Sequence, residues 1–455
     1  MHCTLESRLS ATLSLFFLCL LAACGESSKD TAPPSVAARE GSRVAVGAPQ
    51  QKGNPNQITY DREAATLDAA INDAVRFIDK QPDNTLVALE TVTLYTERAR
   101  LTGNYDDYRN AQLLLDAATA RGNKVSFPCL AHAKLHYALH RLQAASAALD
   151  ACPAMADPVE VAGLRGDIAF YSARYQEAEE LYRALVNQVG TTPQYFRLAM
   201  LRNKMGSPGE AAALLEAAEK RYHGGSSTMK AWFKVQRGLI AWDRGQLDEA
   251  LALYSLASDE LPGWWLIDEQ LAEIKRLKGD TAAAKALYEG VIRRNGLPEH
   301  MDELARLLRE GTAPGSATEW IKRAETIYRE RLKAFPEASV GHAVDHFLQF
   351  GTPAEALALA RRNAELRPYG DAQIALAAAL FRAGQAAAAA ECIARVEASG
   401  WNTAQLHATA AQINAGLGNG LAADAQRAKA LAMNPHVMRV NSLAQPIQPE
   451  LVSLL

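Results

Sequence analysis

Small apolar residues recur along this chain at fixed distances from glycine and alanine, and the spacing predicts the fold. A small residue is followed by Gly seven positions later and by Ala twelve positions later. The complete sets are Ala199, Gly206 and Ala211; Gly238, Gly245 and Ala250; Ala272, Gly279 and Ala284; Ala377, Gly384 and Ala389; and Ala411, Gly418 and Ala423. Neighbouring sets start 34 residues apart, at 238 and 272 and again at 377 and 411.

Each set has the features of two antiparallel helices joined by a tight turn. The first small residue lets the helices approach, the Gly ends the first helix in a left-handed conformation, and the Ala permits close packing in the second helix. One hairpin cannot bury its own apolar face, so neighbouring hairpins are expected to stack around a continuous core. The sequence therefore predicts an all-α solenoid that forms a curved superhelix.

Less regular hairpins fill the gaps between the complete sets. They are Val344 with Gly351 and Ala356, Gly166 with Ala173 and Ala178, and the segments 89–118, 126–152 and 297–336. We count about nine or ten hairpins over residues 61–436, with an insertion at 312–318 that is a candidate joint between two blocks. A single curved superhelix is the simpler interpretation.

The repeat resembles the tetratricopeptide repeat. One unit carries the family's small, Ala, aromatic, Ala and Pro positions in full, as Gly238, Ala250, Tyr254, Ala257 and Pro262. A second unit, with Ala411, Ala423, Ala430 and Pro435, departs from it only at Arg427, which stands at the aromatic position. The resemblance implies a protein that binds segments of other proteins along the concave face formed by the first helix of each hairpin.

The first 23 residues have the pattern of a secretory signal. Arg8 precedes an apolar run at 15–21, and the run ends in the small residues Ala22 and Ala23. This run is too short to span a bilayer, and no later segment has the roughly 20 uncharged apolar residues that a membrane helix needs. Export of the chain is therefore expected.

The residues that end the signal resemble a bacterial lipoprotein box. The motif Leu21-Ala22-Ala23-Cys24 implies that Cys24 is lipidated and becomes the first mature residue, and Gly25 is similar to the outer-membrane sorting pattern. The alternative is an ordinary cleaved signal in which Cys24 is incidental. Residues 24–60 are rich in Ser, Pro, Gly, Gln and Asn, and this composition is typical of a disordered tether. We therefore expect an outer-membrane lipoprotein that faces the periplasm.

Composition and motifs then exclude several functions. The formal net charge of -3 and the absence of a long Lys and Arg run argue against nucleic-acid binding. The sequence lacks a phosphate loop, the His-Glu-x-x-His motif, Cys-x-x-Cys and Gly-x-Ser-x-Gly, so we predict that the protein is not an enzyme. An enzyme with an unrecognised site is the least favoured of three hypotheses.

Two cysteines are candidates for a disulfide. Cys129 starts the first helix of a hairpin and Cys152 ends the second, and these ends are neighbours in an antiparallel pair. An exported protein can form such a bridge, although two buried free thiols are the alternative. Cys392 has no evident mate, and we expect it to pack in the core.

The same hairpin carries the strongest candidate for metal binding. Cys129, His132, His136 and His140 lie on one stripe of a helix, where pairs of His one turn apart could chelate zinc or copper. The tetratricopeptide register places Cys129, His132 and His136 against the partner helix, so hydrogen-bonded core histidines are favoured over ligands. His342 and His346 form a second pair, which is too small a set to indicate a site by itself. A metal-binding or metal-delivery protein is the second hypothesis.

The leading hypothesis is a scaffold or adaptor that binds other proteins of the cell envelope. The family's groove positions correspond here to Phe196, Met200, Asn203, Lys204, Trp232, Leu239, Trp242, Asp243, Glu269, Glu273 and Arg276. A clamp for acidic C-termini needs paired Lys and Asn that are absent, so an aromatic and apolar groove for an extended peptide or amphipathic helix is expected. For Trp232 and Trp242, packing between repeats is the alternative.

The last residues, 437–455, break the periodicity but keep apolar side chains. We expect them to cap the last helix, because the ends of a solenoid must be covered. The alternative is a tail that binds a partner.

Overall fold

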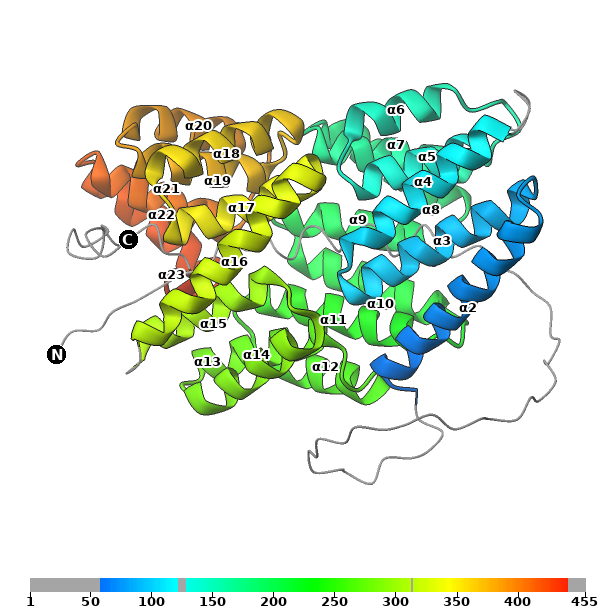
Figure 1. Ribbon diagram of the computed structural model, residues 1–455. Coiled ribbons are helices and arrows are strands. Elements are labelled where there is room, and N and C mark those ends of the chain that lie inside the picture. The colour runs from blue at the N-terminus through cyan, green and yellow to red at the C-terminus, as the bar shows by residue number, and fades with distance from the viewer. Residues whose placement is uncertain (1–57, 122–127, 312–313, 441–455) are drawn as a thin grey trace.

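A computed structural model describes residues 58–121, 128–311 and 314–440 (Figure 1). The signal at 1–23, Cys24, nearly all of the tether and the end of the chain from 441 lie outside the described residues. Within them, no helix is long and apolar enough to cross a membrane.

The described chain folds into ten consecutive helical hairpins, so the predicted all-α solenoid is confirmed. A helix at Tyr60–Lys80, α2, precedes them, and a short one at Val437–Val440, α23, follows. The first five hairpins pair α3 (Thr85–Thr102) with α4 (Tyr105–Arg121), α5 (Cys129–Ala138) with α6 (Leu142–Asp150), α7 (Pro158–Tyr171) with α8 (Tyr175–Gln188), α9 (Thr192–Lys204) with α10 (Pro208–Arg221), and α11 (Ser227–Asp243) with α12 (Leu247–Glu260).

The second five hairpins continue the series without a change in pattern. They pair α13 (Trp265–Leu277) with α14 (Thr281–Asn295), α15 (Pro298–Glu310) with α16 (Pro314–Ala334), α17 (Pro336–Phe350) with α18 (Pro353–Leu366), α19 (Gly370–Arg382) with α20 (Ala386–Ala398), and α21 (Ala404–Gly416) with α22 (Gly420–Met433). The segment 312–318, the candidate joint, lies between the two helices of one hairpin, α15 and α16, and includes the start of α16.

The glycines of the repeat occupy the backbone positions that the spacing predicts. Gly245 has φ 69°, and the corresponding glycines of the other complete sets are also left-handed, at Gly206, Gly279, Gly384 and Gly418. The small residues are required by packing, because a Cβ on Gly238 would lie 2.4 Å from the ring of Tyr254. Gly351 differs, with φ -93°, so the less regular set ends its first helix without a left-handed residue.

Two hairpins form the same left-handed turn with a residue other than Gly. His140 has φ 56° and Ala173 has φ 58°, and both stand where the complete sets have Gly. A residue other than Gly in this region costs of order 1 kcal/mol or more, so the surrounding packing must hold the turn in place. For His140 this packing is extensive, since its side chain is only 3% exposed.

Hairpins that are far apart in the sequence pack against each other. The Trp265 indole N–H donates to the Leu101 carbonyl at 2.8 Å, and the Gly370 N–H donates to the Tyr175 hydroxyl at 2.8 Å. Figure 1 shows the resulting arrangement, in which the yellow and orange helices α16 to α20 lie beside the cyan helices α4 to α7. The superhelix is therefore tightly coiled, and its later hairpins close over its earlier ones.

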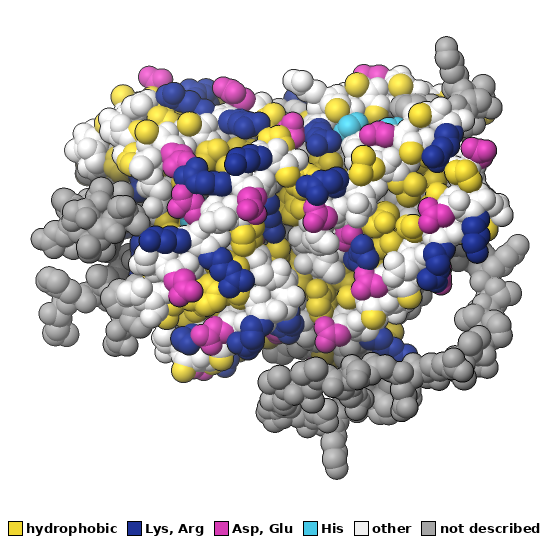
Figure 2. Space-filling model, in the orientation of Figure 1, with side chains coloured by type: hydrophobic (Ala, Val, Ile, Leu, Met, Phe, Trp, Pro, Cys, Tyr) yellow, Lys and Arg dark blue, Asp and Glu magenta, His cyan; other side chains and the backbone are white. Residues whose placement is uncertain are grey.

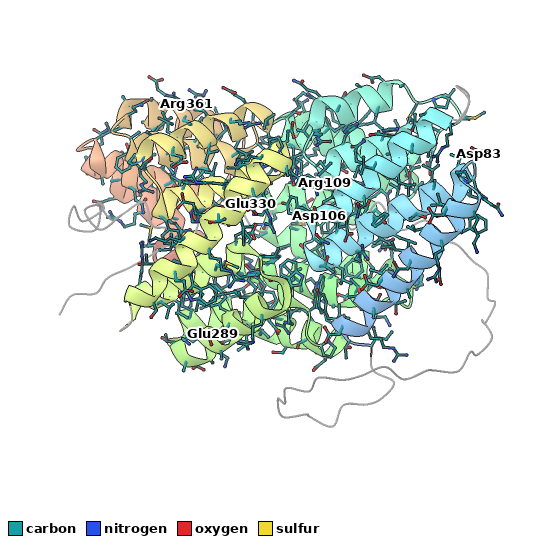
Figure 3. The ribbon with its side chains drawn as sticks, viewed as in Figure 1. Asp83, Asp106, Arg109, Glu289, Glu330 and Arg361 are labelled. Carbon is teal, nitrogen blue, oxygen red and sulfur yellow. A yellow bond between two sulfur atoms is a disulfide. The ribbon has the colours of Figure 1, made fainter. Side chains whose placement is uncertain are left out.

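The outer surface where the later hairpins meet the earlier ones carries both acidic and basic side chains. Asp106 and Arg109, labelled in Figure 3, form an exposed ion pair at 2.6 Å on α4, and the Arg109 guanidinium lies 5.2 Å from the ring centre of Phe335 at the start of α17. Figure 2 shows basic and acidic side chains interspersed over this face rather than gathered into one basic field. Nothing on the face drawn there resembles a surface for nucleic acid.

Candidate functional site

The predicted groove residues lie in three different environments. Phe196, Met200, Trp232 and Leu239 belong to a hydrophobic core cluster, whereas Glu269, Glu273 and Arg276 belong to a buried polar network. Asn203, Lys204, Trp242 and Asp243 line a pocket. The tight coiling therefore converts most of the expected open groove into the interior of the protein.

The first environment, which we name the aromatic segment, is formed by Phe196 and Met200 of α9 and Trp232 and Leu239 of α11. The rings of Phe196 and Trp232 have centres 4.4 Å apart, and both side chains are 0% exposed. Met200 and Leu239 are 6% and 5% exposed. A partner cannot contact Trp232 while the superhelix has this form.

The second environment, the charged segment, follows on the first helices α13, α15 and α17. It comprises the ionisable side chains of these helices that are nine-tenths or more buried: Glu269, Glu273, Arg276, Glu299, His300, Asp302, Glu303, Arg306, His342, Asp345 and His346. Glu273 is the central acceptor, since Arg276 donates to it at 2.8 and 2.9 Å and Tyr288 at 3.2 Å. Arg306 reaches the same carboxylate at 3.4 Å and also pairs with Glu303.

Burial shifts the proton affinities of this segment in both directions. It raises the pKa of Asp302 to about 6, against the attraction of His346, whose Nδ1 lies 2.8 Å away. It lowers the pKa of His342 to about 4, although Glu299 opposes that change. Burial also raises the pKa of Asp345 well above its usual value, and nearby carboxylates add to this effect. All three pKa shifts favour neutral side chains inside the coil.

The third environment is a pocket of about 400 Å³ between the fourth and fifth hairpins on one side and the ninth and tenth hairpins on the other. One wall is formed by the ends of α9 and α11, and the other by α19, α21 and the segment that joins α22 to α23. Its polar lining is Asn203, Lys204, Asp243, Arg244 and Gln246 on the first wall and Asp371, Asn402, Thr403, Gln405 and Asn434 on the second. Trp242, which is 8% exposed, provides aromatic surface.

Direct hydrogen bonds hold the two walls together. The Asn402 N–H donates to the Lys204 carbonyl at 2.9 Å, and the Asn434 side-chain amide donates to the Trp242 carbonyl at 3.0 Å. The Lys204 ammonium pairs with Asp371 at 2.8 Å and lies 5.5 Å from the ring centre of Trp401. The pocket is thus a built feature of the closed coil.

Asp243 is the exposed carboxylate of this pocket. Its side chain accepts a hydrogen bond from the Asn203 amide at 2.8 Å. The pKa of Asp243 is raised, because the pocket walls remove water from the carboxylate, and Asp371 adds to this effect while Lys204 opposes it. The single hydrogen bond from Asn203 and the nearby charge of Lys204 therefore do not fully offset the cost of removing water from the ionised Asp243 carboxylate.

The two candidate cysteines form a disulfide in the structure. Cys129 and Cys152 are joined, with their Cα atoms 5.3 Å apart, at the open end of the hairpin α5–α6. Cys129 therefore has no thiolate for a metal ion. Cys392 is a free, buried thiol that packs beside Gln373.

The histidine stripe is split between two surroundings. The rings of His132 and His136 are stacked with centres 6.1 Å apart, and His132 Nε2 hydrogen-bonds the Thr119 hydroxyl at 2.8 Å. His140 lies beyond the end of α5, in the left-handed turn, with its ring 6.0 Å from that of Tyr171. Across the ranges that the structure describes, no group of three or more His, Cys, Asp or Glu side chains is arranged to hold a metal ion.

Half of the pocket was missed by the sequence analysis. Asp371, Asn402, Gln405 and Asn434 follow Asp243, a predicted groove residue on the first wall, by more than 120 residues. Which hairpins meet could not be deduced from the spacing.

Comparisons with known proteins add little to these observations. No family model matches the chain, and no curated protein matches it either. Among solved structures, a tetratricopeptide repeat protein from Parabacteroides merdae is similar over 58% of this chain and 96% of its own, at 18% identity and a TM-score of 0.33. The Cut9–Hcn1 hetero-tetramer of APC/C is similar over 84% of this chain and 83% of its own, at 13% identity and a TM-score of 0.40.

A third similar structure is PilW, described as a widely conserved type IV pilus biogenesis factor. The likeness covers 47% of this chain and 96% of that one, at 17% identity and a TM-score of 0.35. Scores this low carry no weight for function. The fold assignment rests on the stacked hairpins of the chain itself.

Proposed function

We propose that this protein is a lipid-anchored adaptor that faces the periplasm and binds segments of other envelope proteins in the pocket between its middle and its last hairpins. The observation that carries this proposal is the pocket itself, where polar side chains and Trp242 surround an exposed carboxylate. A volume of about 400 Å³ is at the lower end of the range for ligand sites, so it fits one or two residues of an extended segment rather than a whole helix.

The chemistry of the lining supports a polypeptide ligand. The carboxamides of Gln246 and Gln405 have an acceptor and a donor that no group in the described part of the chain uses, and these are the groups that a main-chain peptide unit needs. An aromatic side chain beside them supplies apolar contact, and aromatic residues commonly dominate the energy of protein interfaces. The aromatic segment and the charged segment have no such access, because their side chains are buried.

Site-specific crosslinking tests the pocket as the binding site. A photo-crosslinking amino acid is placed at Gln405 of the full-length chain in intact cells, and at Leu113 on α4, which is 62% exposed and distant from the pocket, as a matched control. We expect a discrete protein product from position 405 only, reduced when Trp242→Leu is added. Identical products from both positions, or a product from 405 that Trp242→Leu leaves unchanged, would contradict the proposal.

The anchor is tested separately. Acyl chains contribute about 0.8 kcal/mol for each buried methylene, so a multiply acylated Cys24 should hold the protein on membranes. Cys24→Ser is expected to release the chain into the soluble periplasmic fraction while the far-ultraviolet circular dichroism of the purified protein stays unchanged. A Cys24→Ser protein that still sediments with membranes would exclude lipid anchoring through this residue.

A further inference from the structure

Of the two carboxylates that line the pocket, Asp243 and Asp371, only Asp243 has no ion pair in the described part of the chain. Lys204 pairs with Asp371 at 2.8 Å. Arg244 is exposed and forms no ion pair with Asp243 within the described ranges, although the two are neighbours in sequence. Asp243 has one hydrogen bond, from Asn203 at 2.8 Å. A carboxylate that is partly dehydrated and not paired favours the approach of a cation.

The surroundings of Asp243 fit a cation carried on a hydrocarbon stem. Trp242 lines the same pocket, and an indole ring attracts a Lys ammonium or Arg guanidinium through its electron-rich face. It also packs against the methylene groups of such side chains. A free metal ion is disfavoured, because the described residues bring no set of three ligands together.

Two carboxamides of the lining have unused hydrogen-bonding atoms. Gln246 Oε1 and Gln405 Nε2 are shielded from solvent and have no hydrogen-bond partner in the described part of the chain. Rotation about the terminal torsion of a Gln side chain is easy, so each amide can turn its free acceptor or donor toward a ligand. One acceptor and one donor match the N–H and C=O of one peptide unit.

From these contacts we infer that the pocket recognises a basic residue within an extended segment of the partner protein. The Lys or Arg side chain enters beside Trp242 and places its charge against Asp243, while Gln246 and Gln405 bond the flanking main chain. This inference rests on the proposed function, since it names the chemistry of the segment that the adaptor binds at the same site.

Defined peptides test this specificity on the purified full chain. The probes are acetyl-Ser-Gly-Lys-Gly-Ser-amide and its versions with arginine, norleucine or glutamate in place of the lysine, and binding is measured by isothermal titration calorimetry. An ion pair combined with a cation–π contact should make the Lys and Arg peptides bind about tenfold more tightly than the norleucine peptide. Their affinity should fall as sodium chloride is added.

Substitution of the carboxylate identifies its role. Asp243→Asn keeps the size of the side chain, and it should remove the preference for Lys and Arg over norleucine. Asp424→Asn, an exposed carboxylate on α22 outside the pocket, is the matched control and should leave the preference intact. Circular dichroism and melting of both variants verify that the fold is retained.

The outcomes distinguish this inference from the proposed function. Equal binding of all peptides, an unchanged preference in Asp243→Asn, or no binding of any peptide at concentrations up to about 1 mM would overturn the basic-residue specificity. Crosslinking from Gln405 that depends on Trp242 would still support the pocket as a protein-binding site. Selective binding of Lys peptides with no crosslinked partner would instead support the specificity and contradict the adaptor.

Discussion

The aromatic segment and the charged segment occupy equivalent positions in successive hairpins but are stabilised in opposite ways. Both lie on the inner faces of first helices, and both are closed off by the tight coil. In the aromatic segment, Phe196 and Trp232 are 0% exposed and contact each other through their rings. In the charged segment, Glu273 is 1% exposed and accepts bonds from two arginines and a tyrosine.

The difference shows that the same helical repeat can enclose either an apolar core or a network of buried charged groups. Apolar burial is non-directional, so the aromatic segment needs shape and volume only. Buried ionised groups are tolerated only when each is paired, so the charged segment depends on every partner and on pH. The pocket lies where the aromatic segment ends, because Trp242 and Asp243 come directly after it on α11.

The largest expected effect is a cavity in the aromatic segment. Trp232→Ala removes a fully buried side chain and should lower the free energy of unfolding by about 4 kcal/mol. Trp232→Phe is the matched control, and it should cost much less, because the Trp232 indole N–H has no hydrogen-bond partner in the described part of the chain and its removal strands nothing. Urea unfolding followed by circular dichroism measures both variants. A stable Trp232→Ala protein would show that this face is not core.

A smaller loss is expected when the charged segment loses its central acceptor. Glu273→Leu deprives Arg276 and Arg306 of a shared carboxylate, and breaking a buried pair typically costs about 3 kcal/mol. Each arginine keeps another carboxylate, Glu310 or Glu303, and this limits the effect. Adding Arg306→Met should restore part of the loss, and the double-mutant cycle measures the coupling. A loss below about 1 kcal/mol would mean that the network behaves like a surface pair.

The sequence predicted the hairpins well because each depends on local contacts. The left-handed φ of Gly206, Gly279 and Gly384 and the packing of Gly238 against Tyr254 follow from spacings within one repeat. The neighbouring ends of α5 and α6, where Cys129 and Cys152 meet, were likewise deduced within one hairpin. Sequence periodicity carries this kind of information directly.

The candidate site was harder to predict from the sequence, because it is formed by contacts between hairpins that are far apart in the chain. The bond from Asn434 to Trp242 joins residues 192 positions apart, and the bond from Trp265 to Leu101 joins residues 164 positions apart. No repeat spacing specifies such contacts. The groove positions were assigned as if the coil were open, whereas the closed coil buries Trp232 and Trp242 in one core cluster, and of the two only Trp242 also reaches the pocket.

The smallest expected effect is a pH dependence of the free energy of unfolding, which should come from the charged segment and not from the aromatic segment. His342 in the charged segment has its pKa lowered from 6.5 to about 4, chiefly by burial, with Arg331 and Arg367 adding to the effect and Glu299 opposing it. As the pH falls, His342 is protonated in the unfolded chain at a higher pH than in the folded protein, because its pKa is 6.5 in the former and about 4 in the latter. The contribution of His342 to stability is therefore complete above pH 6.5 and is lost as the pH falls toward 4. The loss should reach about 2 kcal/mol at pH 5.

Asp302 changes the stability in the opposite direction over the same pH range, so the effect of His342 has to be measured by comparing a variant with the parent protein. Its pKa is raised to about 6, so its stabilising contribution is present below pH 3.8 and is lost as the pH rises through 6. The two slopes oppose each other in the parent protein, and the raised pKa of Asp345 acts in the same direction as that of Asp302. His342→Gln removes one of them, so this variant should gain about 2 kcal/mol relative to the parent between pH 7 and pH 5, whereas Trp232→Phe in the aromatic segment should differ from the parent by the same amount at both values. Urea unfolding at the two pH values measures the difference, and a pH-independent effect of His342→Gln would show that this histidine does not titrate as its burial requires.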